Sequence, residues 1–246
     1  MSEPGESALW RISEFDALRR KLDAPAAADF RRRTILSTTL QAELRLIERR
    51  RESDDALELL AACFRLREPA LVYLRCDEGI WPVTLFPEQM LYHSPQSLAQ
   101  GSPRALASLV ALGIEPPGVR PPGHWMHERI AQAEAYHPLM PALWALALHG
   151  PRADLLHEIG GNAAYRALRS PASHDLPTPG ALGPAVQRLR RESVPLRKLA
   201  QWPGMGPERA SRLLNALYLT SNLIVSRAHH AAHAGMLHWL FDRLGR

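Results

Sequence analysis

The stretch LVYLRCDEGIWPVTLF, residues 71–86, carries the clearest local signal in the sequence. Two runs rich in β-branched and aromatic residues, which favour strands, flank the polar residues 76–79. The pattern predicts a β-hairpin with strands at 71–75 and 80–86. Pro82 cannot donate to a ladder, so the second strand is expected at an edge or with a bulge. A lone hairpin is marginal in water, so helices are expected to cover it.

Helical spacing of apolar residues surrounds the hairpin on both sides. Ser53, Asp54 and Asp55 suit the start of one of these helices, because acidic side chains favour the positive end of the helix dipole. Four prolines between 115 and 123 predict an extended connector. The helices expected in this part of the chain span residues 7–22, 34–51, 53–67, 103–112, 124–136 and 139–149.

The charge distribution separates the last quarter of the chain from the rest. Residues 1–180 carry 20 basic and 22 acidic side chains, whereas 181–246 carry 10 basic and 3 acidic ones, so the whole net charge of +5 arises there. The stretch 170–180 contains three prolines and precedes this change. We therefore predict an N-terminal domain at 1–169, a linker at 170–180 and a basic helical module at 181–246.

The expected fold is mainly α with a small β component. An N-terminal helical domain holds the hairpin, and a helical module follows it. Pro207 and Glu208 suit the first turn of a helix. The elements expected in the module are helices at 183–192, 195–202 and 207–219, a strand at 223–227 and an apolar terminal helix at 236–244.

The run LRKLAQWPGMGPERASRLL, residues 196–214, resembles a helix-hairpin-helix motif. It has an apolar helix, a Gly-Met-Gly turn and a second helix that contains Ala210. The resemblance implies that turn amides and the following helix end hold a DNA phosphate without reading bases. The physical basis is present, because Gly204 and Gly206 let the backbone approach an anion and a helix N-terminus offers unpaired N–H groups.

The longer stretch 182–227 is similar to a winged-helix domain, with three helices and a first wing strand. That resemblance implies a third helix in the major groove, with Arg209, Arg212 and Asn215 outward; Leu213, Leu214 and Leu217 would then face inward. Residues 228–233 depart from the family pattern, because they show no turn and no second strand. Winged-helix modules also bind proteins, so the resemblance leaves the kind of partner open.

Two functions follow as alternatives. The first is a non-enzymatic protein that binds nucleic-acid backbone through the basic module. The second is a regulatory or scaffold protein that grips another protein, in a bacterial-type signalling or motility assembly, through the module and the terminal helix. An exposed apolar groove beside the third helix would favour the second. The expected nucleic-acid contacts are Arg197, Lys198, Gly204, Gly206, Arg209, Arg212 and Asn215.

The sequence nominates no catalytic or metal site. The HHxxH run at 229–233 has no nearby carboxylate or cysteine, and His127-Glu128 lacks the second histidine of a zinc-protease helix. We expect no enzymatic activity and no cofactor. Cys63 and Cys76 fall in different elements, so a disulfide framework is not expected, and no apolar run reaches membrane-spanning length. A cytoplasmic protein is the simplest expectation.

Overall fold

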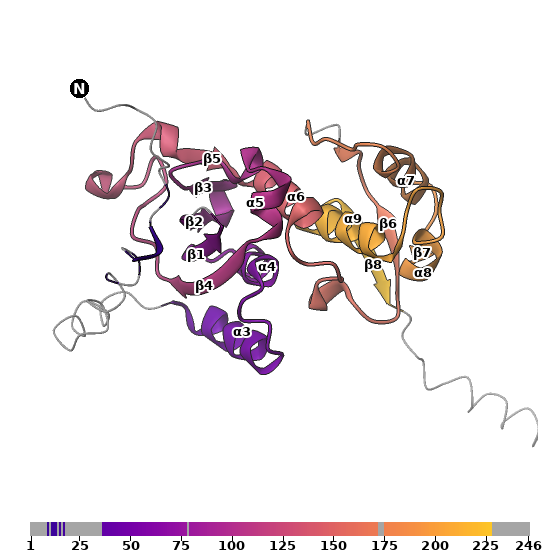
Figure 1. The fold of residues 1–246 in the computed structure, drawn as a ribbon, viewed down its shortest axis with the longest axis horizontal. Coiled ribbons are helices and arrows are strands. Elements are labelled where there is room, and N and C mark those ends of the chain that lie inside the picture. The colour runs from indigo at the N-terminus through magenta and orange to yellow at the C-terminus, as the bar shows by residue number, and fades with distance from the viewer. Residues whose placement is uncertain are drawn as a thin grey trace, which may run out of the picture.

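The computed structural model describes residues 9, 11–13, 15, 17, 36–77, 79–171 and 175–227. These residues contain a five-stranded and a three-stranded antiparallel sheet, with α6 (Leu139–His149) and α9 (Pro207–Leu219) running between them (Figure 1). Three predicted features lie outside the described residues: the terminal helix, the HHxxH run and most of the first helix.

The predicted hairpin is confirmed and forms the centre of the larger sheet. Cys76 lies opposite Gly79, so two residues close the turn. The expectation of an edge or bulged second strand is wrong, because β2 lies between β1 and β3 and pairs with β1 without a register shift. Pro82 is tolerated because it lies opposite Tyr73, before the first described pair of β2 with β3 at Thr84. The strand order is β4-β1-β2-β3-β5, with β1 (Ala70–Cys76), β2 (Gly79–Phe86), β3 (Leu91–His93), β4 (Val110–Glu115) and β5 (Tyr136–Pro138).

The expectation of a mainly α fold with a small β component is wrong. The described residues hold eight strands in two sheets, so the protein is α+β with a sheet at the core of its N-terminal part. The helix expected at 103–112 ends early, as α5 (Pro103–Ala107), and β4 follows it to pair with β1. The region 124–136 is likewise not a helix but two short 3-10 turns, η4 (His127–Arg129) and η5 (Ala133–Ala135), before β5.

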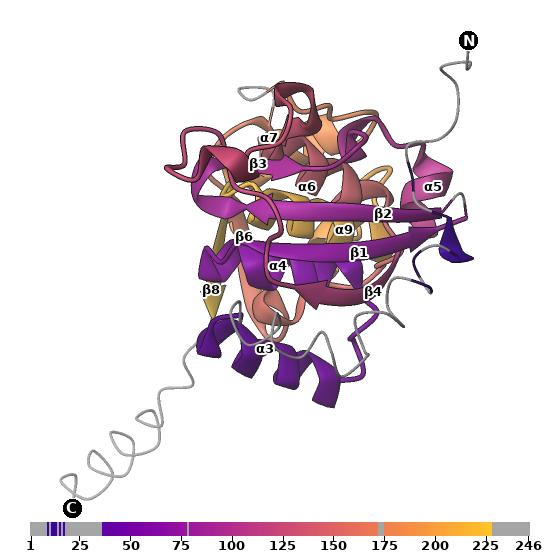
Figure 2. The ribbon, with the colours of Figure 1, turned by 90° about the vertical axis from the view of Figure 1, so that its left-hand side faces the viewer.

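Helices cover the larger sheet on the side of the smaller one (Figure 2). Asp55 caps α4 (Ala56–Leu66), where its side chain accepts from the amides of Leu57 and Glu58 at 2.9 and 3.1 Å. α4 and α3 (Thr38–Arg49) confirm two of the three helices predicted before the hairpin, those at 34–51 and 53–67. α6 is also confirmed; it is apolar along most of its length because α9 and the sheet region enclose it.

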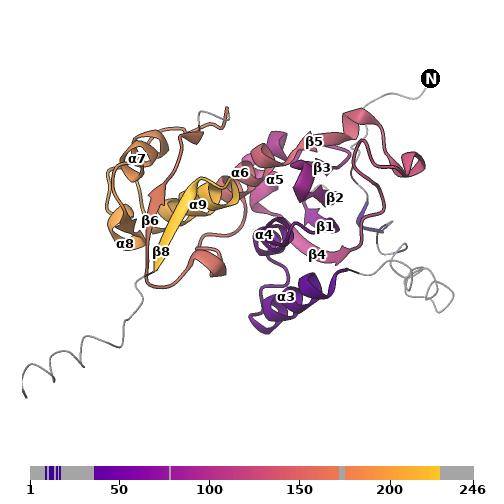
Figure 3. The ribbon, with the colours of Figure 1, turned by 180° about the vertical axis from the view of Figure 1, so that it is seen from behind.

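The smaller sheet completes the C-terminal part of the molecule (Figure 3). Its order is β7-β6-β8, with β6 (Ala163–Ala167), β7 (Val194–Pro195) and β8 (Leu223–Arg227). The helices α7 (Leu182–Leu189), α8 (Leu196–Leu199) and α9 confirm the three predicted ones, and β8 confirms the predicted strand. The sequence did not reveal β6, which precedes residues 170–180 and yet forms the middle of this sheet.

One hydrophobic core runs through both parts. It joins Val72 of the larger sheet to Trp144 of α6, Leu214 of α9 and Tyr165 of the smaller sheet. Leu176, within the stretch expected as a linker, is buried in the same core, and the indole of Trp144 donates to the carbonyl of Pro177 at 2.9 Å. None of the helices in the described part of the chain has the length and apolar character needed to cross a bilayer.

Candidate functional site

The turn between α8 and α9 has a geometry that requires glycine at one position. Gly204 has φ +71°, in the left-handed region. A Cβ there would come within 2.7 Å of the Cβ of Ala181, so the turn lies tightly against the start of α7. The amide of Met205 donates to the carbonyl of Trp202 at 3.0 Å and closes the turn.

Gly206 is the N-cap of α9 and is open to its surroundings. Its backbone is extended, no side chain caps the helix, and a Cβ added here would meet nothing within 4 Å. Pro207 follows at the first helical position, so the donors of the first turn are the amides of Glu208 and Arg209. This end of α9 therefore presents backbone N–H groups and the positive end of the helix dipole.

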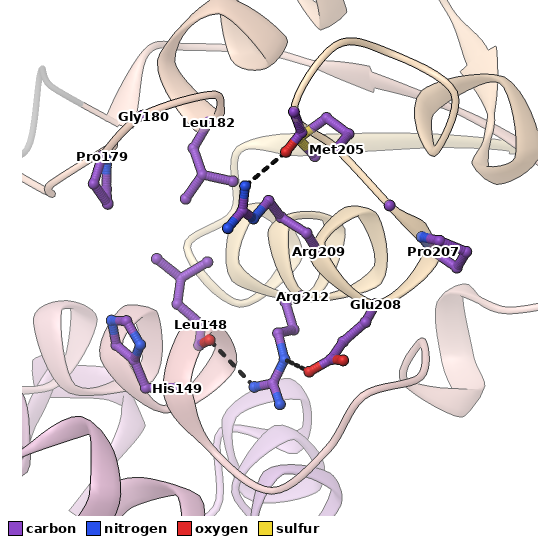
Figure 4. A pocket seen from close by; sticks show the side chains of 12 residues that line it. Leu148, His149, Pro179, Gly180, Leu182, Met205, Pro207, Glu208, Arg209 and Arg212 are labelled. Atoms are coloured by element: carbon purple, nitrogen blue, oxygen red, sulfur yellow. Dashed lines mark hydrogen bonds and ion pairs between the residues drawn. The ribbon is translucent and has the colours of Figure 1, made fainter.

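A pocket of about 800 Å³ lies beside this end of α9 (Figure 4). Four of the seven predicted contact residues line it: Gly204, Gly206, Arg209 and Arg212. The rest of the wall comes from the end of α6, the residues just before and at the start of α7, and the other residues of the turn and of the first turn of α9, and much of it is apolar. The apolar lining residues are Leu148, Pro179, Leu182, Met205 and Pro207.

Arg209 is the exposed guanidinium of this pocket. Its Nη1 donates to the carbonyl of Gly204 at 2.6 Å, which folds the side chain back over the turn. Figure 4 shows it pointing across the pocket towards Leu182. Its hydrogen bond goes to a neutral carbonyl, so the positive charge of Arg209 is not balanced by that contact.

The guanidinium of Arg212 is occupied mainly by contacts within the protein. Its Nη1 donates to the carbonyls of Leu148 and Gly150, at 3.2 and 2.6 Å, and its Nε pairs with Glu208 at 2.9 Å. The side chain is only 16% exposed. Because the last carbonyls of a helix lack intrahelical partners, Arg212 satisfies the end of α6 and ties α9 to it.

The expectation that Asn215 faces outward is wrong. It is fully buried; its Oδ1 accepts from the amide of Leu156 and its Nδ2 donates to the carbonyl of Asp154, both at 2.9 Å. Most of α9 is buried in the same way, since α6 packs along it. Of the third helix only the first turn, Pro207 to Arg209, is fully exposed, so the outward face with Asn215 that the winged-helix resemblance implies is not present.

Arg197 and Lys198 lie on α8 and do not line the pocket. Both are exposed. Lys198 pairs with Glu192 at 3.3 Å, and the same carboxylate pairs with Arg188. The hydrogen bond from Arg188, together with Lys198, holds the pKa of Glu192 below its ordinary value.

Sequence reasoning missed a second group of arginines. Arg166, Arg190 and Arg191 line a separate pocket between β6, the end of α7 and β8. The adjacent Arg190 and Arg191 were visible in the basic block. Arg166 could not be associated with them, because the strand that carries it was not recognised. Among the residues that the structure describes, no three His, Cys, Asp or Glu side chains gather as a metal site would require.

Comparison with known proteins gives no relative: no family model, no curated protein and no solved structure matches this chain.

Proposed function

We propose that this protein binds the phosphate backbone of nucleic acid through its C-terminal module, without enzymatic activity and without reading bases. The charge balance of the module carries the proposal. Residues 181–227 contain eight Arg and Lys side chains and two carboxylates. Both carboxylates, Glu192 and Glu208, are already paired within the module, so its excess of positive charge remains available to a polyanion.

The open end of α9 supports a specific place for one phosphate. The amides after Gly206 and the guanidinium of Arg209 lie on the same pocket. Backbone N–H groups at a helix N-terminus favour an anion, and such contacts carry no base information. Burial of Asn215 and of most of α9 leaves only the first turn of this helix exposed, which favours contacts with the backbone over base readout. A cytoplasmic location, where nucleic acid is accessible, belongs to the same proposal.

A salt titration of binding to duplex and single-stranded DNA tests the proposal. Affinity should fall linearly with salt on logarithmic axes, and Arg209→Gln should make the slope shallower by roughly one unit, as for one lost phosphate contact. Equal affinity for oligonucleotides of different sequence is also expected. Absence of binding at low salt would overturn the proposal.

A substitution at Gly206 tests the helix end itself. Gly206→Asp should cap the amides of the first turn and place a negative charge where the phosphate sits, so DNA affinity should drop while the helix is stabilised. Gly118→Asp is the matched control, because Gly118 is exposed, a Cβ there also meets nothing within 4 Å, and the change in charge is equal. Equal effects of the two variants would show that only net charge matters.

The apolar wall of the same pocket favours the second candidate, a regulatory or scaffold protein. Leu182 and Met205 offer an apolar surface beside α9, as a groove for a partner's side chain would. Selection from a displayed peptide library, counter-selected against Met205→Glu, tests this candidate. Enrichment of apolar peptides that require Met205 supports it, and no enrichment contradicts it.

A further inference from the structure

The second arginine pocket has a volume of about 630 Å³ and lies on the surface of the smaller sheet. Arg166 comes from β6, whereas Arg190 and Arg191 come from the end of α7. The antiparallel register places Arg166 opposite Ile224 of β8, which forms another wall. Three guanidinium-bearing residues thus converge from two elements that are distant in sequence.

Among the residues that the structure describes, none of these three arginines has an acidic partner, unlike the nearby Arg188. None of the residues that line the pocket is acidic. The Nε of Arg166 donates to the carbonyl of Arg190 at 3.3 Å, and Nη1 of Arg190 donates to the Gln187 side chain at 3.2 Å, so both contacts are with neutral oxygens. Arg188, one turn away on α7, is by contrast paired with Glu192.

The three arginines are exposed, so water and salt screen their mutual repulsion, but their shared concavity is strongly favourable for an anion. Three like charges around one concavity repel each other, and the repulsion falls when a multivalent anion binds between them. A guanidinium group presents its N–H donors as a planar fork that matches phosphate oxygens. Leu168 and Ile224, which are 52% and 39% exposed, add an apolar wall for the carbon part of a ligand.

We infer that Arg166, Arg190 and Arg191 form a binding site for a phosphate group. The inference deepens the proposed function if the phosphate belongs to a nucleic-acid backbone, and to that extent it rests on it. The same chemistry would also bind the phosphate of a small organic molecule. Phosphate is favoured over carboxylate because a phosphomonoester or pyrophosphate carries more than one negative charge, and because each phosphodiester of a backbone, although singly charged, offers two oxygens to a guanidinium fork and has charged neighbours along the chain.

Titration of the full chain with inorganic pyrophosphate at constant ionic strength tests the site. The triple variant Arg166→Gln, Arg190→Gln, Arg191→Gln should bind pyrophosphate at least roughly tenfold more weakly, as expected for lost charge-assisted hydrogen bonds. Arg191→Gln alone, a milder change, should show a smaller loss in the same direction. An unchanged Kd in a folded triple variant overturns the inference.

A matched control separates the site from net charge. Arg45, Arg75 and Arg104 are exposed on α3, β1 and α5, far along the chain from the pocket. Their combined substitution by Gln removes the same charge and should leave pyrophosphate binding as in the wild type. An equal loss in this control overturns the inference, since any three arginines would then serve.

Two further arms identify the source of the phosphate. A single-stranded oligonucleotide that displaces pyrophosphate, with a salt slope reduced by roughly two units in the triple variant, places the backbone in this pocket. Pyrophosphate binding that no oligonucleotide displaces supports the site for a small phosphate-bearing molecule and shows that the nucleic-acid backbone does not enter this pocket. A polyglutamate peptide that binds more tightly than pyrophosphate overturns the phosphate inference in favour of an acidic protein.

Discussion

Asn215 shows why the orientation of single residues was hard to predict. An asparagine on an amphipathic helix normally belongs to the solvent side, and Arg209 and Arg212 suggested such a side. However, α9 is enclosed on most faces, so its polar residues must find partners inside the protein. Asn215 does so by pairing with the backbone of Asp154 and Leu156. Its amide is therefore a structural link between α9 and this loop.

Replacement of this amide should reduce stability. In Asn215→Ala, the buried amide of Leu156 and the carbonyl of Asp154 lose their partner, which should lower the free energy of unfolding by about 1–3 kcal/mol. Urea unfolding followed by circular dichroism measures the change. Asn162→Ala, at an exposed position, should stay within about 0.5 kcal/mol of the wild type. A stable Asn215→Ala variant that binds DNA poorly would instead restore its predicted role as a contact.

At the level of elements, local signals were read correctly and distant pairings were not. The hairpin, α4, α6 and α9 carry their own turn residues, caps or periodic apolar positions, so the sequence predicts them. β4 and β6 have no such signal. Their short apolar runs are equally compatible with a helix or a loop. They form strands because they pair with β1 and β8, which lie far away in the sequence. The fold class was wrong for this reason.

The contact between α9 and α6 leads to a prediction about Arg212. Arg212→Ala leaves two carbonyls at the end of α6 without their charged donor, so the free energy of unfolding should fall by about 1.5–3 kcal/mol. Thermal or urea unfolding measures it. Arg209→Ala, one turn earlier on the same helix and exposed, should change stability by no more than about 0.5 kcal/mol. If the two variants are equally stable, Arg212 does not tie the helices together.

The sequence predicts those residues of the candidate site that lie together in one continuous segment. Gly204, Gly206, Arg209 and Arg212 do line one pocket, because turn and helix are adjacent in sequence. The contribution of Leu148 and Leu182 to that pocket depends on how α6 and α7 pack, which periodicity does not encode. The structural role of Arg212 was invisible for the same reason.

On the scale of the whole molecule, a charged cluster links the N-terminal helices to the C-terminal part. Arg152 pairs with Asp55 at 2.6 Å and with Glu58 at 3.0 Å. Glu58 also accepts a hydrogen bond from the amide of His157 at 2.7 Å. Burial raises the pKa of Glu58, although the His157 amide and Arg152 act in the opposite direction. The free-energy cost of burying this carboxyl group therefore depends on pH.

The dependence of stability on pH follows from this raised pKa. A carboxyl whose pKa is higher in the folded than in the unfolded state loses stabilising effect as the pH rises from the ordinary value of 4.5 through the folded value. Glu58→Gln removes that loss. The difference in unfolding free energy between variant and wild type should thus shift in favour of the variant over this interval and then level off. Urea unfolding at a series of pH values measures it; a difference that moves the other way contradicts it.

The position of β6 has a consequence for how the protein is made. On the ribosome this middle strand emerges first, and its two neighbours follow only after α7 and after α9. The growing chain must leave one edge of β6 unpaired until β7 has been made and the other edge unpaired until Arg227 has left the exit tunnel, so this sheet closes only after α9 has been synthesised. A gene fragment that begins after β6 would encode the basic module without the middle strand of its sheet. This sheet could then not form, even if the helices of the module did.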